Sequence, residues 1–496
     1  MQLIDLRSSL DRTSQAFFRF RRLGPDRTLI TNIEGRWLIL TDEEFRAYAI
    51  GTADPAGALH GRLDEHNFLR ATWDEAAARD AIAARKRFLG FGPNLHVMVI
   101  TLRCNETCVY CHASRADMTE TQTDMTHEIA EKSVDLAFAS TSPAITIEFQ
   151  GGEPLVRFDL VKHIIEYAKA KNETANKTVE FTMVSNLALM TDEKLDYLLD
   201  HKVQICTSID GPKDLHDKQR KLPMHSSYDA ATEWIRTINQ AYIDRGLDPT
   251  LYHVEALLTT TRAALGRAKE IVDTYAELGC RAMFLRPIDP FGFAGKTAKL
   301  VEYPRADYQQ FYREATDYIL ELNRQGTQMI ERYAAIFLTK ILRGEDPNFL
   351  DIRSPAGAGI AMLAYSYDGN VYTCDEGRML AAQGDDTFRI GHVAESRYRD
   401  LVGHPTVRAM VIASNLDSQP DCVDCTYNPY CGIQTTHNHK TQGSIFGRMR
   451  ESNICAVHKG IQDYLFGKLA DAEPHVLESF DRWTTIRPRE HFLHDS

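Results

Sequence analysis

The sequence predicts an α/β fold: a partial (β/α)6 barrel of the TIM type, with a small α+β domain before it and a cysteine-rich domain after it. Two observations carry this prediction. Six apolar, strand-like runs alternate with helix-period segments, at 95–101, 144–149, 178–184, 203–209, 252–258 and 281–288. After about residue 345 this alternation gives way to short segments rich in Gly, Cys, Asn and Pro. We therefore expect four regions: 1–92, 93–344, 345–465 and a C-terminal tail at 466–496.

The first region reads as a β-hairpin followed by helices. Two strand-like runs lie within 27–41, and a helix is expected to begin at Asp42, its N-cap. A charged helical stretch covers 73–89, and the breaker cluster at 90–93 marks the boundary with the barrel. Apolar residues at helical spacing predict a further helix over 305–322. In the cysteine-rich region, from about residue 345 to about residue 456, we expect no strong helix.

Composition narrows the function classes. The chain has 496 residues, 43% hydrophobic and 25% charged, which is ordinary for a globular protein. A formal net charge of -12 disfavours a nucleic-acid partner, and the charged N-terminus and the absence of a long apolar stretch disfavour a membrane protein. We expect a cytoplasmic protein, where ten cysteines indicate metal or catalytic chemistry rather than disulfides.

The first strand leads into a C-x3-C-x2-C loop formed by Cys104, Cys108 and Cys111. A [4Fe–4S] cluster held by three thiolates leaves one iron open, which can chelate the amino and carboxylate groups of S-adenosylmethionine (SAM). One-electron cleavage then gives a radical able to abstract hydrogen from unactivated carbon. Tyr110 is expected to pack on the adenine side. A zinc knuckle using His112 is the alternative, but adjacent Cys and His are poorly placed on one tetrahedral ion.

The ends of the second and third strands carry candidate SAM-binding residues. Gly151 and Gly152 allow backbone to approach a ligand, and Glu153 can accept from an ammonium group. Ser185 and Asn186 can reach the SAM ribose or carboxylate. The alternatives are an ordinary tight turn at the first position and a capped turn at the second.

The fourth strand is followed by Asp210 and Arg220, which can orient cofactor or peptide; a turn with a surface ion pair is the alternative. Cys206 and Cys280 lie in or beside apolar strands, so we assign them no chemistry.

Together these motifs resemble the radical SAM superfamily, and the downstream cysteines resemble its SPASM branch, which includes anaerobic sulfatase maturases and many peptide-modifying enzymes. Six segments are similar to the His-Xaa-Ser system radical SAM maturases: 18–24, 148–155, 206–212, 284–294, 367–380 and 384–391. The resemblance implies a ribosomally made precursor peptide as substrate, a flavodoxin- or ferredoxin-type electron donor, and a second radical SAM maturase as a possible partner.

The C-terminal cysteines resemble the ligands of the outer auxiliary cluster of SPASM proteins, which implies one auxiliary [4Fe–4S] cluster at Cys422, Cys425, Cys431 and Cys455. A zinc ribbon is the alternative, because four thiolates also satisfy tetrahedral zinc. The inner auxiliary cluster is expected to be absent, since only Cys374 precedes this set and Thr435 stands where another ligand belongs. We expect no metal contact for Cys374, because one thiolate cannot hold a cluster.

In sulfatase maturases the aspartate after the cysteine equivalent to Cys374 is the general base, which implies this role for Asp375; a solvated turn is the alternative. The N-terminal region is similar in outline to winged-helix domains that bind a leader peptide as an added strand, although a stabilising lid explains the same pattern. The predicted reaction is hydrogen abstraction from a peptide side-chain carbon followed by crosslinking. Formylglycine formation in a sulfatase and a non-catalytic iron–sulfur scaffold are the alternatives.

Overall fold

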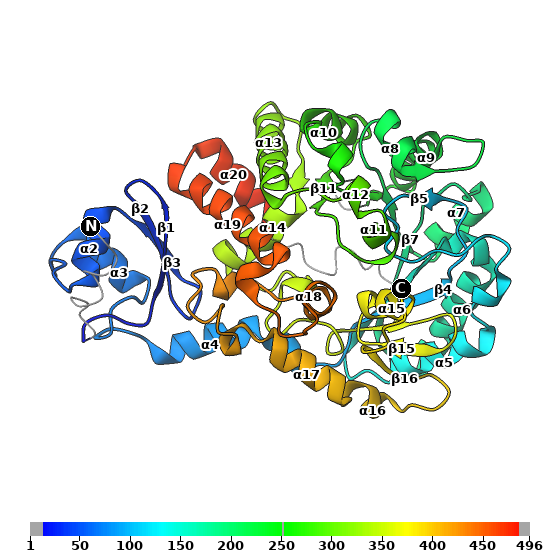
Figure 1. Cartoon of the computed structure of the whole chain (residues 1–496), viewed down its shortest axis with the longest axis horizontal. Coiled ribbons are helices and arrows are strands. Elements are labelled where there is room, and N and C mark those ends of the chain that lie inside the picture. The colour runs from blue at the N-terminus through cyan, green and yellow to red at the C-terminus, as the bar shows by residue number, and fades with distance from the viewer. Residues whose placement is uncertain (1–12, 250–251, 486–496) are drawn as a thin grey trace.

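The computed structural model of the chain describes residues 13–249 and 252–485. Its main sheet has nine strands in the order β12-β10-β8-β7-β6-β4-β14-β15-β16. Strands β4, β7, β15 and β16 of this sheet are labelled in Figure 1. The first six strands in this order pair in parallel, so the predicted partial barrel is confirmed. They are β4 (Leu95–Thr101), β6 (Ala144–Gly151), β7 (Thr178–Val184), β8 (Gln204–Ser208), β10 (Glu255–Thr259) and β12 (Leu285–Arg286).

The predicted strands match the observed ones closely, with one exception. The runs at 95–101 and 178–184 are β4 and β7 to the residue. The sixth run is divided: β11 (Ala282–Met283) pairs with β13 (Ile330–Glu331), and only β12 joins the barrel sheet. The split arises because the chain changes pairing partner within one apolar run, which hydrophobicity alone does not reveal.

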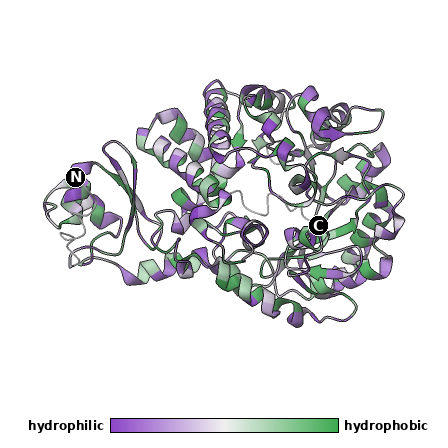
Figure 2. Cartoon of the chain, viewed as in Figure 1, coloured by the Kyte–Doolittle hydropathy of each residue, from purple (hydrophilic) through white to green (hydrophobic). Residues whose placement is uncertain are grey.

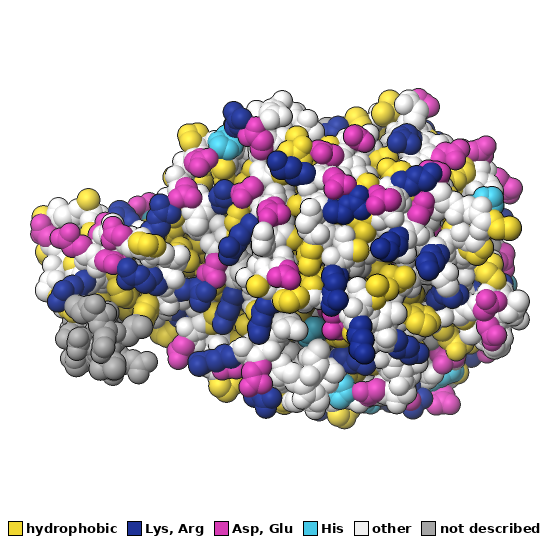
Figure 3. All heavy atoms as spheres, turned by 45° about the horizontal axis from the view of Figure 1, so that its top comes forward, with side chains coloured by type: hydrophobic (Ala, Val, Ile, Leu, Met, Phe, Trp, Pro, Cys, Tyr) yellow, Lys and Arg dark blue, Asp and Glu magenta, His cyan; other side chains and the backbone are white. Residues whose placement is uncertain are grey.

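Helices cover the outer face of the barrel strands, as α/β architecture requires. They are α5 (His127–Phe138), α6 (Phe158–Ala175), α7 (Asp192–Asp200), α8 (Lys213–Gln219), α9 (Ser227–Asp244), α10 (Ala268–Glu277) and α13 (Arg305–Arg324). Strand residues such as Ile147, Phe149 and Leu258 are fully buried. Hydrophobic residues follow the sheet and the inner helix faces (Figure 2), and acidic and basic side chains are intermixed on the surface seen in Figure 3.

The N-terminal domain contains a three-stranded antiparallel sheet of β1 (Arg19–Gly24), β2 (Arg27–Thr31) and β3 (Trp37–Leu40). The predicted hairpin is β2–β3, and β1 is an additional strand. Three helices follow: α2 (Asp42–Ala49), α3 (Ala58–Glu65) and α4 (Glu75–Arg85). The N-cap of α2 is Thr41 rather than the expected Asp42, because Thr41 forms a capping box with Glu44.

The C-terminal region continues the barrel sheet. Its strand β14 (Met362–Tyr365) pairs in parallel with β4, and β15 (Asn370–Tyr372) and β16 (Arg389–His392) follow antiparallel. The helices of this region are α15 (Asp375–Ala381), α16 (Tyr398–Val402), α17 (Pro405–Ser414), α18 (Thr435–Gln442), α19 (Asn453–Asp471) and α20 (Pro474–Trp483).

Two expectations for the C-terminal region need correction. A ten-residue helix, α17, lies in the stretch where no strong helix was expected. The expected boundary at residue 465 falls inside α19, and α20 packs on α13 and on α14 (Arg332–Leu338), so the described part of the expected tail is folded. None of the described helices has the length and apolar character that a bilayer span requires.

Candidate active site

The three cysteines of the C-x3-C-x2-C loop lie just beyond the carboxyl end of β4. The loop is pinned on both sides: β5 (Thr107–Cys108) pairs with β9 (Arg220–Lys221), and the backbone N–H of Cys104 donates to the Ala116 carbonyl at 3.2 Å. The carbonyl of Cys111 accepts from the N–H of Phe293 at 2.8 Å. All three thiols are free and partly buried.

A cavity of about 220 Å³ opens at this end of the barrel. Its walls come from the carboxyl ends of β6, β7, β8, β10 and β12, where parallel barrels place their sites. The cavity brings together most of the residues singled out from the sequence: Cys104, Cys108, Tyr110, Cys111, Gly151, Gly152, Ser185, Asn186, Arg220 and Asp375. Glu153 and Asp210 lie behind this wall rather than on it, and they support residues that do line it.

Gly151 and Gly152 let two backbone segments meet. Gly151 has a φ of +136°, and a Cβ there would lie 2.1 Å from the Thr101 carbonyl oxygen. A Cβ on Gly152 would lie 2.2 Å from the carbonyl oxygen of Arg103, the residue before Cys104. The close approach that requires glycine is therefore to the chain entering the cysteine loop, whereas the sequence had indicated an approach to a ligand.

Glu153 joins the ends of β6 and β7. Its carboxylate is buried and accepts from the Ser185 hydroxyl at 2.8 Å and from the backbone N–H groups of Asn186 at 2.7 Å and Leu155 at 2.9 Å. Burial raises the pKa of this carboxyl to about 7, against the effect of these hydrogen bonds. In this structure Glu153 braces the cavity wall, and a contact with the SAM ammonium group stays a prediction.

Tyr110, Asp210 and Arg220 form a buried polar group beside Cys108. The Tyr110 hydroxyl donates to Asp210 at 2.7 Å, and the guanidinium of Arg220 donates to the same carboxylate at 3.2 Å and lies over the Tyr110 ring at 5.3 Å. Another nitrogen of Arg220 is 3.9 Å from the Cys108 sulfur. Asp210 is fully buried, so the surface ion pair considered from the sequence is wrong, and Asp210 orients Arg220 and Tyr110 from behind.

Asp375 reaches the cavity from the C-terminal region. It begins α15, is 7% exposed, and accepts from Arg378 at 2.7 Å. Arg378 also donates to the Ala113 carbonyl at 3.0 Å, which ties α15 to the cysteine loop. The solvated-turn alternative for Asp375 is therefore wrong. Cys374 points elsewhere, into an apolar cluster with Val97.

The residues at the site that sequence reasoning missed include Glu106, Arg286 and Gly292. Glu106 lies inside the cysteine motif and is buried, 3.7 Å from the Cys108 sulfur. Arg286 ends β12 and lines the cavity. Gly292, at a φ of +56°, packs against Cys111, since a Cβ there would lie 2.4 Å from the Cys111 carbonyl oxygen. Of these residues, only Arg286 could have been found from the sequence, because it stands at the end of a predicted barrel strand.

Four of the remaining seven cysteines, Cys422, Cys425, Cys431 and Cys455, belong to the C-terminal region. Cys422, Cys431 and Cys455 line one small cavity together with Ile433 and Met449. Cys425 belongs to the same group, because its charge raises the pKa of the Cys422 and Cys455 thiols. All four are free thiols.

The surroundings of both sets of thiols fit the iron–sulfur clusters that their spacing implies. Burial raises the pKa of the Cys104 and Cys108 thiols, and binding to a cationic centre would deprotonate them. Three thiols beside a cavity fit a cluster with an open iron. Cys422, Cys431 and Cys455 share one apolar cluster, and with Cys425 they fit a closed one. Among the residues that the structure describes, no three His, Cys or acidic side chains are grouped for a single metal ion.

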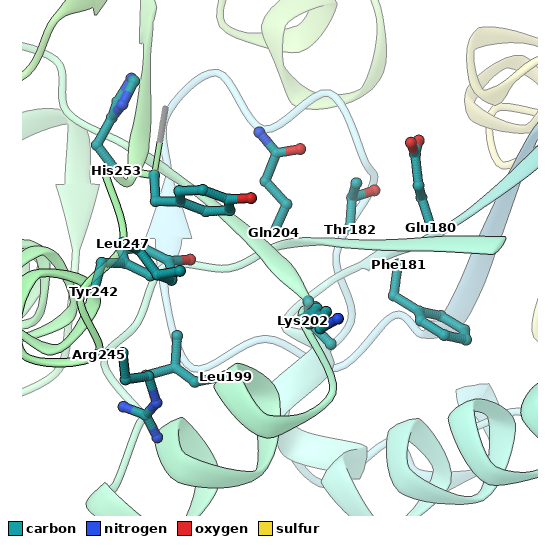
Figure 4. Close-up of a pocket in the computed structure, with 12 residues that line it drawn as sticks. Glu180, Phe181, Thr182, Leu199, Lys202, Gln204, Tyr242, Arg245, Leu247 and His253 are labelled. Carbon is teal, nitrogen blue, oxygen red and sulfur yellow. The ribbon is translucent and has the colours of Figure 1, made fainter. Parts of the chain in front are cut away.

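A second cavity lies elsewhere in the barrel. It has a volume of about 260 Å³, and its lining residues include Thr182, Gln204, Arg245, Tyr242 and His253 (Figure 4). Lys202 to Gln204 and His253 place it toward the amino ends of β8 and β10, the end of a parallel barrel that serves stability. No cysteine lines it. The smaller cavity with the three thiols is therefore the candidate active site.

Comparison with known proteins agrees with this geometry. Residues 98–255, which include the cysteine loop and the wall from β6 to β10, match the model of the radical SAM superfamily. Residues 98–255 are therefore similar to a radical SAM domain. Proteins of this superfamily bind a [4Fe–4S] cluster and SAM, and the donor set described above fits both.

Relatives extend the likeness beyond the radical SAM domain. A cysteine-type anaerobic sulfatase-maturating enzyme of Clostridium novyi is 24% identical over 334 residues, which is 66% of this chain and 83% of the relative. The structure of anSMEcpe with bound AdoMet has a TM-score of 0.63 at 18% identity and covers 81% of this chain and 100% of its own. Streptococcus suis SuiB bound to precursor peptide SuiA has a TM-score of 0.53 at 15% identity, covering 90% and 99%. The structural matches establish a shared fold.

Proposed function

We propose that this protein is a radical SAM peptide maturase that abstracts hydrogen from a side-chain carbon of a ribosomally synthesised precursor peptide of the His-Xaa-Ser type and installs a crosslink. The observation that carries the proposal is the cavity itself. It combines three thiols for a SAM-binding cluster with a carboxylate, Asp375, that belongs to another domain. When bound, the cluster and SAM supply one-electron cleavage and a radical for hydrogen abstraction.

Individual residues of the chain have distinct roles in binding the cluster and SAM. Cys104, Cys108 and Cys111 hold the cluster, and Arg220, fixed by Asp210, lies against the Cys108 sulfur and limits the freedom of that ligand. Tyr110, Gly151, Gly152, Ser185 and Asn186 line the cavity and would hold SAM.

Asp375 takes the proton that the substrate loses after hydrogen abstraction. Its ion pair with Arg378 holds the carboxylate at the cavity wall. Loss of one hydrogen atom, one proton and one electron removes two hydrogens from the peptide for each bond formed.

The surplus electron needs an acceptor, and we assign the auxiliary [4Fe–4S] site to Cys422, Cys425, Cys431 and Cys455. A cluster bound there would supply a one-electron acceptor. The absence of an inner auxiliary cluster is part of the proposal, because Cys374 is packed among apolar residues and Thr435 begins α18.

Peptide binding has a candidate platform in the N-terminal domain. β1 and β3 are the edges of its three-stranded sheet, and an extended leader peptide can add to such an edge. SuiB, which shares the fold, was solved with its precursor peptide. A flavodoxin- or ferredoxin-type electron donor and a second maturase stay predictions.

Formylglycine formation in a sulfatase is the second candidate. The similarity to the Clostridium novyi enzyme and the placement of Asp375 support it. A non-catalytic iron–sulfur scaffold is less well supported, because the full set of thiols and the braced cavity wall are present together.

The test is mass spectrometry of a His-Xaa-Ser repeat peptide after anaerobic incubation with reconstituted protein, SAM and reductant. A sulfatase-derived peptide is incubated in parallel, and Cys104→Ala is the control. Loss of two hydrogens per site in the repeat peptide, absent in the control, supports the proposal. Oxidation of only the sulfatase peptide to an aldehyde favours the second candidate. A protein that releases no 5′-deoxyadenosine with either peptide contradicts both.

A further inference from the structure

Cys431 differs from the other C-terminal cysteines in having a buried ammonium group beside it. Lys340 follows α14 and is 8% exposed; its Nζ donates to the Ile352 carbonyl at 2.7 Å and to the Cys431 carbonyl at 3.3 Å. Among the residues that the structure describes, no carboxylate lies within ion-pair distance of it. The nearest acid that raises its pKa, Asp346, is paired with Arg353 at 2.6 Å.

A buried ammonium without an acidic partner is costly. The two carbonyl dipoles offset part of this cost. A four-cysteine iron–sulfur cluster carries net negative charge. A cluster bound at Cys431 would therefore supply the counter-charge that Lys340 lacks.

A second buried group contacts the Cys431 sulfur directly. His458 on α19 is fully buried, and its Nδ1 lies 3.7 Å from the sulfur. Its ring packs between Tyr333 and Phe337, with centroids 6.0 and 5.5 Å away. A thiolate can only accept, so the hydrogen bond to a ligated Cys431 runs from N–H to sulfur.

The backbone at Cys431 is held equally firmly. A Cβ on the next residue, Gly432, would lie 2.5 Å from the Asp351 carbonyl oxygen and 2.6 Å from the Ile352 Cα. The segment that receives the Lys340 hydrogen bond at Ile352 therefore also clamps Cys431. Charge, hydrogen bond and backbone packing converge on one of the four cysteines.

We infer that Lys340 and His458 are positioning residues that raise the reduction potential of the auxiliary cluster through Cys431. The inference rests on the proposed function, in which this site accepts the electron lost by the substrate. Reduction adds one negative charge to the cluster. A nearby positive charge in a low-dielectric setting and an N–H donor to a ligand sulfur both stabilise the reduced form. The substrate loses the electron, the cluster gains it, and the proton goes to the base.

The test is an EPR-monitored redox titration of protein carrying Cys104→Ala, in which the remaining cluster signal comes from the auxiliary site. Lys340→Met and His458→Phe are expected to shift the midpoint potential to more negative values, and Lys340→Arg is expected to retain it. Lys459→Met is the matched control. Burial raises the pKa of Cys455 and the charge of Lys459 opposes that rise, so Lys459 also acts on the site, but it is half-buried and screened by water, and a smaller shift in potential is expected. Iron is counted in every sample.

The outcomes separate this inference from the function on which it rests. Two results would overturn the inference while leaving the auxiliary site in place: an unchanged midpoint potential in Lys340→Met with full iron content, or a shift in Lys340→Met no larger than the shift in Lys459→Met. Loss of iron from Lys340→Met, with iron retained in Lys340→Arg, supports the counter-charge role. A Cys104→Ala protein without iron overturns the auxiliary site, and the inference with it.

Discussion

Gly152→Ala tests whether the wall behind the cysteine loop sets the position of the cluster ligands. The added Cβ would meet the carbonyl oxygens of Arg103 at 2.2 Å and Leu102 at 2.4 Å. An unstrained contact of this kind is longer by about 1 Å, and both obstacles are backbone, so the chain entering Cys104 must move by a comparable distance. Overpacking of this kind costs about 1–3 kcal/mol, and a displacement of about 1 Å lowers a catalytic rate by up to about 100-fold.

The assay for Gly152→Ala is 5′-deoxyadenosine release per bound iron, together with the urea midpoint. The matched control is Gly467→Ala in α19, where a Cβ would meet nothing within 4 Å and alanine favours the helix. We expect the control to retain activity and gain slight stability. If Gly152→Ala cleaves SAM as well as the control does, the wall does not position the loop and the reasoning fails.

Two further predictions concern buried charges. The folded-state pKa of Glu153 is raised to about 7 from an ordinary 4.5, so the stability that this group contributes is complete below pH 4.5 and declines by about 3 kcal/mol as pH rises to 7. Glu153→Gln should therefore make the free energy of unfolding less dependent on pH between 4.5 and 7. An unaltered slope of that free energy against pH would contradict the assignment. Asp210→Asn leaves Arg220 buried without its counter-charge and should cost about 3–5 kcal/mol in chemical denaturation. The half-exposed pair of Arg21 and Asp463 is the comparison, with Asp463→Asn costing about 1 kcal/mol or less; equal losses would be inconsistent with this account.

The parts of the fold that follow from local pattern were predictable. The barrel strands are apolar because both faces are covered, so each appears as a continuous run. β1 escaped prediction because three of its six residues, Arg19, Arg21 and Arg22, are charged and interrupt the apolar pattern. The reason lies far along the chain: Arg19 donates to the Val423 carbonyl at 2.7 Å, and Arg21 pairs with Asp463 at 2.6 Å. A charged strand is stable there because the C-terminal region supplies its partners.

For the candidate active site too, only the residues that belong to a local motif could be predicted from the sequence. The C-x3-C-x2-C motif is local, so its ligands could be named from spacing. Asp375 could be assigned to the cavity only through resemblance, since its contact with the cysteine loop runs through Arg378 and spans more of the chain than any motif. Glu153 and Lys340 show the limit most clearly, because a turn acid and a helix lysine acquire their roles from burial and from distant carbonyls and amides.

The most direct test of the central claim is 5′-deoxyadenosine formation measured with reductant and SAM in the wild-type protein and in Cys104→Ala. The account predicts release by the wild-type protein and none by the variant, which should nevertheless retain the iron bound at its C-terminal cysteines. Release by Cys104→Ala, or none by a wild-type protein carrying both clusters, would contradict the assignment of the SAM-binding cluster to Cys104, Cys108 and Cys111.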